Sequence, residues 1–241
     1  MPRPVVLMIA LSALCYAGSA QDSVADSAIS KAAYNNAVGL FHKYTDKQAR
    51  LYNGFLHLGY SHKIQGTAYY PDNTWHKGSL VYDGIFYADV NMMYDVYKDE
   101  LVIQHFHKLM VTLHGEKVKE FTFDNSRFIR VMRDSLRNVP LSTGFYQELY
   151  KGKITLLAKR QKLLEETITD VLEQKFIPRN FYYLYRNNTW HTVKTYNDLM
   201  GVLKERSKEI RQHLKKNKVK YRRERERALI MAVQYFDAST Q

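Results

Sequence analysis

The chain has 241 residues, of which 45% are hydrophobic and 25% charged, and these proportions exclude disorder along its whole length. Its formal net charge of +12 favours negatively charged partners. Aromatic residues reach 13%, with 19 Tyr and 11 Phe, which is typical of β-sheet proteins because aromatic rings pack well on a pleated surface.

The first segment, residues 1–20, has the pattern of a secretory signal peptide. Arg3 supplies a positive start, an apolar run covers residues 5–16, and small residues end the segment at Ala20. The run is too short for a membrane span, which takes about 20 apolar residues. Cleavage after Ala20 would remove Cys15, the only cysteine, so the sequence predicts an exported chain of the periplasm or cell surface without disulfides or thiol chemistry.

The next part of the chain changes from helical to strand-like patterns. Residues 23–50 are polar and Ala-rich and predict a short helix, and residues 60–70 predict a strand region. Residues 77–159 give the strongest β signal, with short apolar runs separated by turn residues such as Asp83-Gly84. These runs predict an antiparallel meander, with strands at residues 80–82, 85–87, 92–97, 101–106, 109–113, 118–123, 128–132, 145–150 and 154–157.

The last third of the chain combines one more hairpin with helices. An apolar stripe predicts a helix over residues 159–175, and two short runs across Asn187-Asn188 predict a hairpin. Two amphipathic helices then close the chain. Their stripes are Leu199, Leu203, Ile210 and Leu214 in the first, and Ala228, Leu229, Ala232, Val233 and Phe236 in the second.

The predicted fold class is therefore α+β: a large, curved antiparallel β-sheet (a meander) with an N-terminal helix, one helix between strands and two C-terminal amphipathic helices. The corresponding domain organisation is a signal peptide at residues 1–20, a β-rich domain with short helices at residues 21–195, and a basic helical pair at residues 196–241 that packs on it.

Positive charge is concentrated near the end of the chain. Residues 204–227 hold 12 Lys and Arg against four Glu, a net charge of +8. This pattern predicts an anion-binding surface for an anionic lipid headgroup, a glycolipid or an acidic protein. Nucleic acid is not expected as a partner of an exported protein. The alternative is a solvated helical face whose glutamates offset part of the charge. The candidate anion-binding residues are Lys215, Lys216, Lys218, Arg222 and Arg223.

No sequence motif for catalysis or for binding a cofactor is present, so we assign no catalytic residue, metal or cofactor. His105 and His107 would place two rings on one face of a strand, with His76 or His114 as a third metal ligand, but two surface histidines are the favoured interpretation. Four recurring aspartates are assigned mainly to turns and other structural positions rather than to acid–base chemistry: Asp83, Asp89, Asp95 and Asp99.

Tyrosines crowd the predicted sheet. A sheet lined with aromatic rings can hold a lipid or a sugar, because each ring offers flat apolar area with a polar tip. Packing between neighbouring strands is the favoured alternative. The candidate ligand-binding residues are Tyr82, Tyr87, Tyr94 and Tyr97.

Several segments carry a family resemblance. They are residues 51–54, 78–87, 93–102, 128–130, 142–150, 181–184 and 208–237. Taken together, the sequence resembles the uncharacterised exported proteins common in soil Bacteroidota, over nearly all of the chain after residue 20. The resemblance implies a lineage and a cell-envelope location, and no activity is assigned to that family.

Three functions remain open from the sequence. The leading one is a non-catalytic binding or scaffold protein of the cell envelope. The second is a periplasmic carrier that holds an apolar or lipid ligand in a curved sheet, and the third is a hydrolase with carboxylate or histidine chemistry. A filled sheet interior would favour the first, an open apolar cavity the second, and a cleft joining His105, His107 and two carboxylates the third.

Overall fold

The computed structural model describes residues 33–37, 40, 50–133, 139–168 and 172–238. The chain divides into two units, Met1–Ala37 and Val38–Gln241, and each is considered by itself. In the first unit residues 33–37 are helical, within the range 23–50 where the sequence predicts a helix. The predicted signal peptide, residues 1–20, lies outside the described residues.

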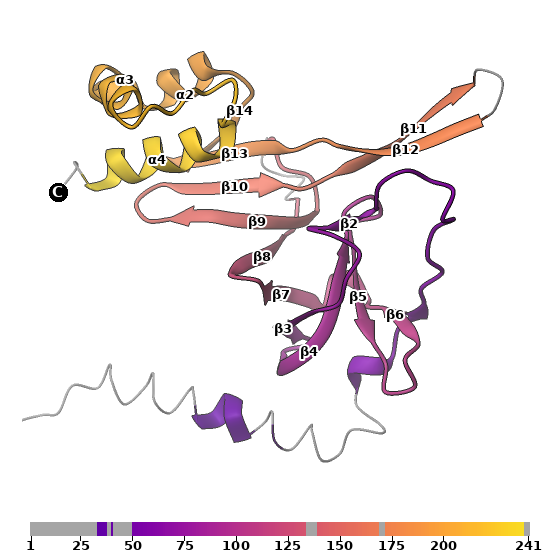
Figure 1. The fold of residues 1–241 in the computed structure, drawn as a ribbon. Helices are drawn as coiled ribbons and strands as arrows, with labels where there is room; N and C mark the ends of the chain where they lie inside the picture. Colours follow the sequence, from indigo (N-terminus) through magenta and orange to yellow (C-terminus); the bar gives the residue numbers. More distant parts are fainter. Residues whose placement is uncertain (1–32, 38–39, 41–49, 134–138, 169–171, 239–241) are drawn as a thin grey trace, which may run out of the picture. The chain divides into compact units, whose positions relative to one another are not determined.

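The second unit is built on a 12-stranded antiparallel sheet with the order β1-β6-β5-β4-β3-β7-β8-β9-β10-β13-β14, and β2 pairs with β4 (Figure 1). Most neighbours in the sheet are also neighbours in sequence, which confirms the predicted meander. The sheet is not strongly curled, so the pronounced curvature expected of a ligand carrier is absent from the described strands. The strands are β1 Phe55–Leu56, β2 Tyr69–Tyr70, β3 His76–Tyr82, β4 Ile85–Asp95, β5 Glu100–Gln104, β6 Met110–Thr112, β7 Val118–Phe123, β8 Ser126–Val131, β9 Gly144–Lys151, β10 Thr155–Lys159, β13 Phe181–Arg186 and β14 Thr189–Val193.

Tight turns fix the register of three hairpins. The turn at Asp83-Gly84 joins β3 to β4 with φ angles of 50° and 77°, and Asn187-Asn188 joins β13 to β14 with 49° and 59°. Both turns confirm the sequence prediction, since a type I′ turn needs positive φ at its two central residues. Asp124-Asn125 makes a third turn of this kind between β7 and β8, which the sequence analysis did not single out.

The predicted helix over residues 159–175 is wrong. The structure has a separate two-stranded hairpin there, β11 (Lys162–Ile168) paired with β12 (Leu172–Pro178). Apolar residues recur every fourth position at Leu164, Ile168 and Leu172. A helix would place these residues on one face, but so does a hairpin, because Leu164 and Ile168 share a face of β11 and Ile168 pairs with Leu172. The β-branched Thr167 and Ile168 then favour the strand.

The C-terminal region contains more helical segments than the two expected. It comprises α2 (Tyr196–Val202), the 3₁₀ turn η4 (Lys204–Arg206), α3 (Ser207–Lys216) and α4 (Arg225–Ala238). Thr195 and Asp198 start α2 with a reciprocal capping box. The predicted first helix is interrupted after Val202, next to Gly201, a residue type that weakens helices. Two further 3₁₀ turns lie earlier in the chain, η2 (Arg50–Tyr52) and η3 (Gly115–Lys117).

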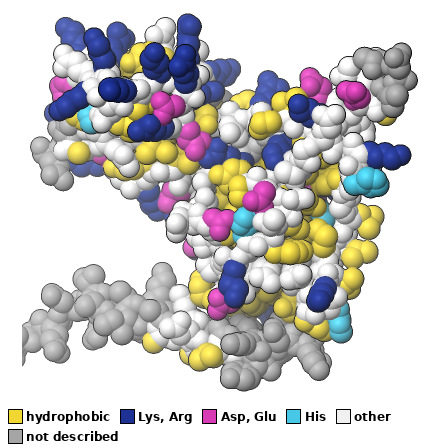
Figure 2. Space-filling view, viewed as in Figure 1, with side chains coloured by type: hydrophobic (Ala, Val, Ile, Leu, Met, Phe, Trp, Pro, Cys, Tyr) yellow, Lys and Arg dark blue, Asp and Glu magenta, His cyan; other side chains and the backbone are white. Residues whose placement is uncertain are grey.

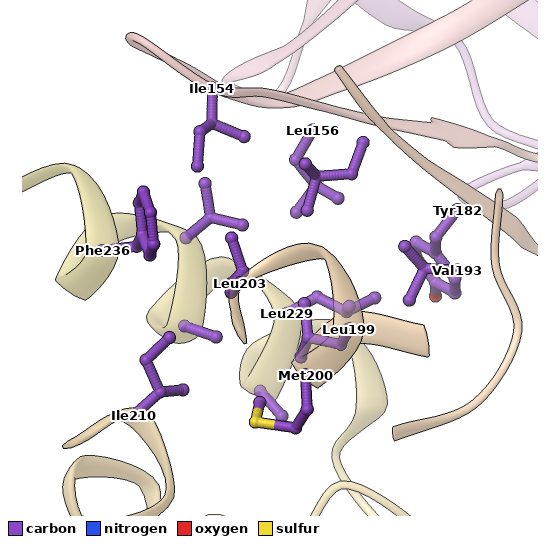
Figure 3. Close-up of a cluster of buried hydrophobic side chains, with 14 of the residues drawn as sticks. Ile154, Leu156, Tyr182, Val193, Leu199, Met200, Leu203, Ile210, Leu229 and Phe236 are labelled. Carbon is purple, nitrogen blue, oxygen red and sulfur yellow. The ribbon is translucent and has the colours of Figure 1, made fainter. Parts of the chain in front are cut away.

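The helices pack on the sheet through one apolar cluster, shown in Figure 3. The sheet contributes side chains such as Ile154, Leu156 and Tyr182, and the helices contribute the predicted stripes, which confirms that these stripes are buried. Burial of such a face supplies most of the stability of short helices. The helical members include Leu199, Leu203, Ile210, Leu214, Ala228, Leu229, Ala232, Val233 and Phe236.

Candidate anion-binding groove

A groove of about 1110 Å³ lies where the start of α2, the end of α3 and residues 217–223 meet. Figure 2 shows Lys and Arg side chains gathered over these C-terminal helices. Six of the basic side chains line the groove, and no acidic residue does: Arg211, Lys215, Lys218, Lys220, Arg222 and Arg223.

The floor of the groove is apolar and aromatic. Leu214 and Val219 are buried there, and the rings of Tyr196 and Tyr221 lie 5.3 Å apart between centroids. The guanidinium of Arg211 sits 5.8 Å from the centroid of the Tyr196 ring, close enough for a cation–π contact. The Tyr221 hydroxyl is buried and has no hydrogen-bond partner among the described residues. The groove thus combines a positive rim with an apolar floor and a free polar atom.

The glutamates of this region do not neutralise the groove. Each of the four forms an ion pair with an arginine outside it, and these pairs are Glu205 with Arg186, Glu209 with Arg206, Glu224 with Arg227, and Glu226 with Arg160. None of the six groove cations has a carboxylate within ion-pair distance in the described part of the chain. The four glutamates therefore offset the positive charge of arginines outside the groove and not that of the groove residues.

The end of α3 gives the groove its shape. The Val219 amide donates to the Leu214 carbonyl oxygen at 3.0 Å, and Lys218 adopts a left-handed conformation with φ of 56°. This is a Schellman-type helix end, in which the left-handed position is usually glycine. A lysine there keeps a cation at the negative end of the helix dipole. Val219 is buried by the same motif and becomes part of the groove floor.

Four of the five predicted anion-binding residues line this groove. They are Lys215, Lys218, Arg222 and Arg223, whereas Lys216 is exposed and does not line it. Four further residues line the groove without being among the five candidates: Arg211 and Lys220, which belong to the basic stretch 204–227, and the unpredicted Tyr196 and Tyr221. Helical spacing is a signal for the first of these, because Arg211 precedes Lys215 by four residues and so shares its face of α3.

The four candidate ligand-binding tyrosines lie elsewhere. Tyr82, Tyr87 and Tyr94 are buried in the core of the sheet, while Tyr97 is 38% exposed. The Tyr94 ring packs against three phenylalanines, and its hydroxyl donates to Asp99 Oδ1 at 2.5 Å. For Tyr94, such close packing is the alternative that the sequence favours.

The histidine pair does not occupy a strand. His105 and His107 lie in the turn between β5 and β6, with ring centroids 5.4 Å apart, so the expectation of two rings on one strand face is wrong. The reason is that β5 ends at Gln104, one residue earlier. The other two histidines considered, His76 and His114, pair with carboxylates of their own.

A different histidine, His57, lies in a buried polar cluster. Its Nδ1 is 2.9 Å from Thr112 Oγ1, and its Nε2 is 2.8 Å from the Tyr69 hydroxyl. Asp95 is fully buried next to it, and its Oδ2 accepts a hydrogen bond from the Tyr60 hydroxyl at 2.6 Å. Burial lowers the pKa of His57 and raises that of Tyr69 to about 12, so both side chains are kept neutral.

Glu100 completes this cluster. Its Oε2 lies 4.0 Å from His57 Nδ1, and Asp95 and Glu100 face each other across β4 and β5. Burial raises the pKa of the Glu100 carboxyl, and the neighbouring Asp95 acts in the same direction. Of these three residues, only Asp95 was a candidate from the sequence, and no motif marks His57 or Glu100.

Comparison with protein-family models, with curated proteins and with solved structures finds no match to this chain. Among the described residues, no helix has the length and apolar character needed to cross a membrane.

Proposed function

We propose that this chain is a non-catalytic binding protein of the cell envelope, and that the groove takes the phosphate-bearing headgroup of an anionic lipid. The observation that carries this proposal is a set of six cations, none with an ion-pair partner among the described residues, around an apolar floor. Clustered like charges cost stability unless an anion offsets them. The exported location rests on the signal-peptide pattern of residues 1–20.

The floor favours an amphiphile over a purely polar anion. Leu214, Val219 and the rings of Tyr196 and Tyr221 offer a surface on which the first carbons of an acyl chain can rest. A volume of about 1110 Å³ exceeds what a phosphate group fills. The unpartnered hydroxyl of Tyr221 can donate a hydrogen bond to a headgroup oxygen. Tyrosines beside basic side chains also occur in single-stranded nucleic-acid grooves, so an oligonucleotide is the competing ligand to test.

Vesicle binding tests the proposal. The protein should co-float with vesicles of phosphatidylcholine and phosphatidylglycerol but not with phosphatidylcholine alone. Added salt should weaken binding, because at physiological ionic strength the attraction between charges decays over a Debye length of about 8–10 Å. R222E/R223E should weaken binding at least about 30-fold, since each basic residue near an anionic membrane contributes about 1 kcal/mol.

A matched control separates the groove from net charge. K208E/K216E makes the same change in charge on exposed residues of α3 that do not line the groove. It should weaken binding only a few-fold. Equal losses in the two variants would show that the whole basic surface attracts lipid and would refute the groove.

Two further measurements identify the ligand class. Millimolar inorganic phosphate should compete weakly, because it cannot contact the floor; complete competition would mean that free phosphate is the ligand. Y221F removes only the unpartnered hydroxyl and should weaken lipid binding without destabilising the fold. Tighter binding of an oligonucleotide than of anionic vesicles would overturn the lipid proposal.

A further inference from the structure

The buried cluster around His57 has the donor set of a metal site. Nitrogen or oxygen atoms of His57, Asp95 and Glu100 all lie within 4.8 Å of one another. The His57 side chain is 1% exposed and Asp95 is fully buried, whereas the Glu100 side chain is 38% exposed. The cluster is thus enclosed on two sides and open to solvent at Glu100.

The backbone holds two of the three side chains rigidly. The His57 amide donates to the Met110 carbonyl oxygen at 2.9 Å, which fixes the segment after β1. Asp95 Oδ1 accepts hydrogen bonds from the amides of Tyr97 and Lys98, both at 3.0 Å. These bonds anchor the Asp95 carboxylate at the end of β4 independently of any ligand.

Carboxylate lone pairs remain available at the centre of the cluster. A carboxylate has about four acceptor positions, and Asp95 uses three of them, two for backbone amides and one for Tyr60. The Glu100 carboxylate accepts no hydrogen bond in the described part of the chain. If His57 Nε2 donates to the Tyr69 hydroxyl, its Nδ1 lone pair accepts a hydrogen bond from the Thr112 hydroxyl at 2.9 Å. A metal ion on the side of Glu100 would take the place of that hydrogen bond.

Nearby lysines do not satisfy these carboxylates. The Lys98 ammonium lies over the Tyr60 ring, 5.2 Å from its centroid, and Lys162 donates to the carbonyl oxygen of Tyr69. Neither forms an ion pair with Asp95 or Glu100 at 4.0 Å or less.

We propose that His57, Asp95 and Glu100 bind one Zn²⁺ ion, with the fourth position left for water. One nitrogen and two oxygen ligands, with a position open to solvent, match the mixed sets that zinc accepts, while Mg²⁺ and Ca²⁺ prefer all-oxygen sites. Tyr69 then acts as the outer partner that orients the histidine ring. Zinc–ligand distances of about 2.0–2.2 Å bring ligand atoms closer together than the 4.0 Å between His57 Nδ1 and Glu100 Oε2, so Glu100, the least buried member of the set, must move inward.

Calorimetry on the metal-stripped full chain tests the site. ZnCl₂ should bind with one-to-one stoichiometry and micromolar or tighter affinity, and MgCl₂ should give no comparable signal. E100Q keeps the size of the side chain and should weaken zinc binding at least about 10-fold, because even the loss of an outer partner of a metal ligand costs about 10–100-fold. Absence of zinc binding at 100 µM would overturn the proposal.

Two control variants exclude adventitious binding. H105A/H107A removes the histidine pair of the β5–β6 turn, and E116Q alters the histidine–glutamate contact at His114. Both should bind zinc as the wild type does. Loss of binding in H105A/H107A with E100Q unaffected would place the metal on the surface and refute the buried site. Substituted Co²⁺ should give the intense visible absorption of four-coordinate geometry, and a weak six-coordinate spectrum would contradict it.

This inference does not depend on the lipid groove. E100Q should leave vesicle binding unchanged, and R222E/R223E should leave zinc affinity unchanged, so either proposal can fail alone.

Discussion

Arg160 and Glu226 join the end of β10 to helix α4 through a two-armed ion pair. The two guanidinium nitrogens lie 2.6 and 2.9 Å from the two carboxylate oxygens. Arg160 is buried, and its Nε also donates to Gln147 Oε1 at 2.6 Å. The Tyr182 hydroxyl donates to the same carboxylate at 2.9 Å. The pair therefore fixes the position of the helices on the sheet.

Removing the charge of Glu226 should destabilise the protein. E226Q leaves a buried guanidinium without its counter-charge, and we expect a loss of about 1.5–3 kcal/mol in the free energy of unfolding, the range for hydrogen bonds to charged groups. E224Q is the matched control, because Glu224 pairs with Arg227 on the surface and should contribute less than about 0.5 kcal/mol. Urea unfolding measures both, and equal effects would contradict the role of burial.

The same carboxylate predicts a pH dependence. Burial raises the pKa of Glu226, but hydrogen bonds from Arg160 and Tyr182 outweigh it and hold the pKa below its usual 4.5. The unfolded chain therefore takes up this proton first as the pH falls. The stabilisation is complete above about pH 4.5 and is lost as the pH falls through the lower pKa of the folded state. Urea unfolding between pH 7 and 3 should show a shallower decline for E226Q, and parallel curves would refute this assignment.

Lys218 should favour binding at the expense of stability. K218G relieves the left-handed backbone at φ 56° and should stabilise the fold by up to about 1 kcal/mol, while vesicle binding falls about five-fold. K216G makes the same substitution two residues earlier, inside α3, and should instead destabilise by about 0.5–1 kcal/mol. Thermal unfolding and vesicle flotation distinguish the two. A destabilised K218G would mean that the lysine side chain supports the fold.

Two glycines with open space around them should respond oppositely to alanine. Gly84 has φ of 77° in the β3–β4 turn, and Gly201 lies in α2 without positive φ. G84A should cost about 1 kcal/mol because it forces a side chain into left-handed geometry. G201A should stabilise by about 0.5–1 kcal/mol because alanine favours helix. Changes of the same sign in chemical denaturation would contradict this account.

The sequence predicts those parts of the fold that local chemistry determines. Asp83-Gly84 and Asn187-Asn188 specify tight turns by themselves, and apolar runs on either side then define strands. Local chemistry does not determine the segment of β11 and β12, because apolar residues four positions apart suit a helix and a hairpin equally. The hairpin is decided by the pairing of β11 with β12 and by the bridge between Gln65 and Lys175. Neither contact can be recognised from the local sequence pattern.

The two candidate sites differ in the same way. Most of the basic groove comes from one continuous stretch of the chain. The density of Lys and Arg in that stretch therefore predicts Lys215, Lys218, Arg222 and Arg223. Tyr196 joins them only because α2 and the segment after α3 pack together. His57 reaches Asp95 and Glu100 through strand pairing across β1, β6, β5 and β4, a relationship that sequence spacing does not encode.

The exposed hairpin of β11 and β12 bears on how copies of the protein associate at high concentration. Much of it is solvent-exposed, and Ile168 and Leu172 are 81% and 54% exposed on one face. Bare strands of this kind pair readily with strands of other molecules. Three exposed glutamates, Glu165, Glu166 and Glu173, place like charges along the same ribbon and oppose such stacking between copies. Replacing these three side chains, which lie outside both proposed binding sites, should therefore increase aggregation at high concentration.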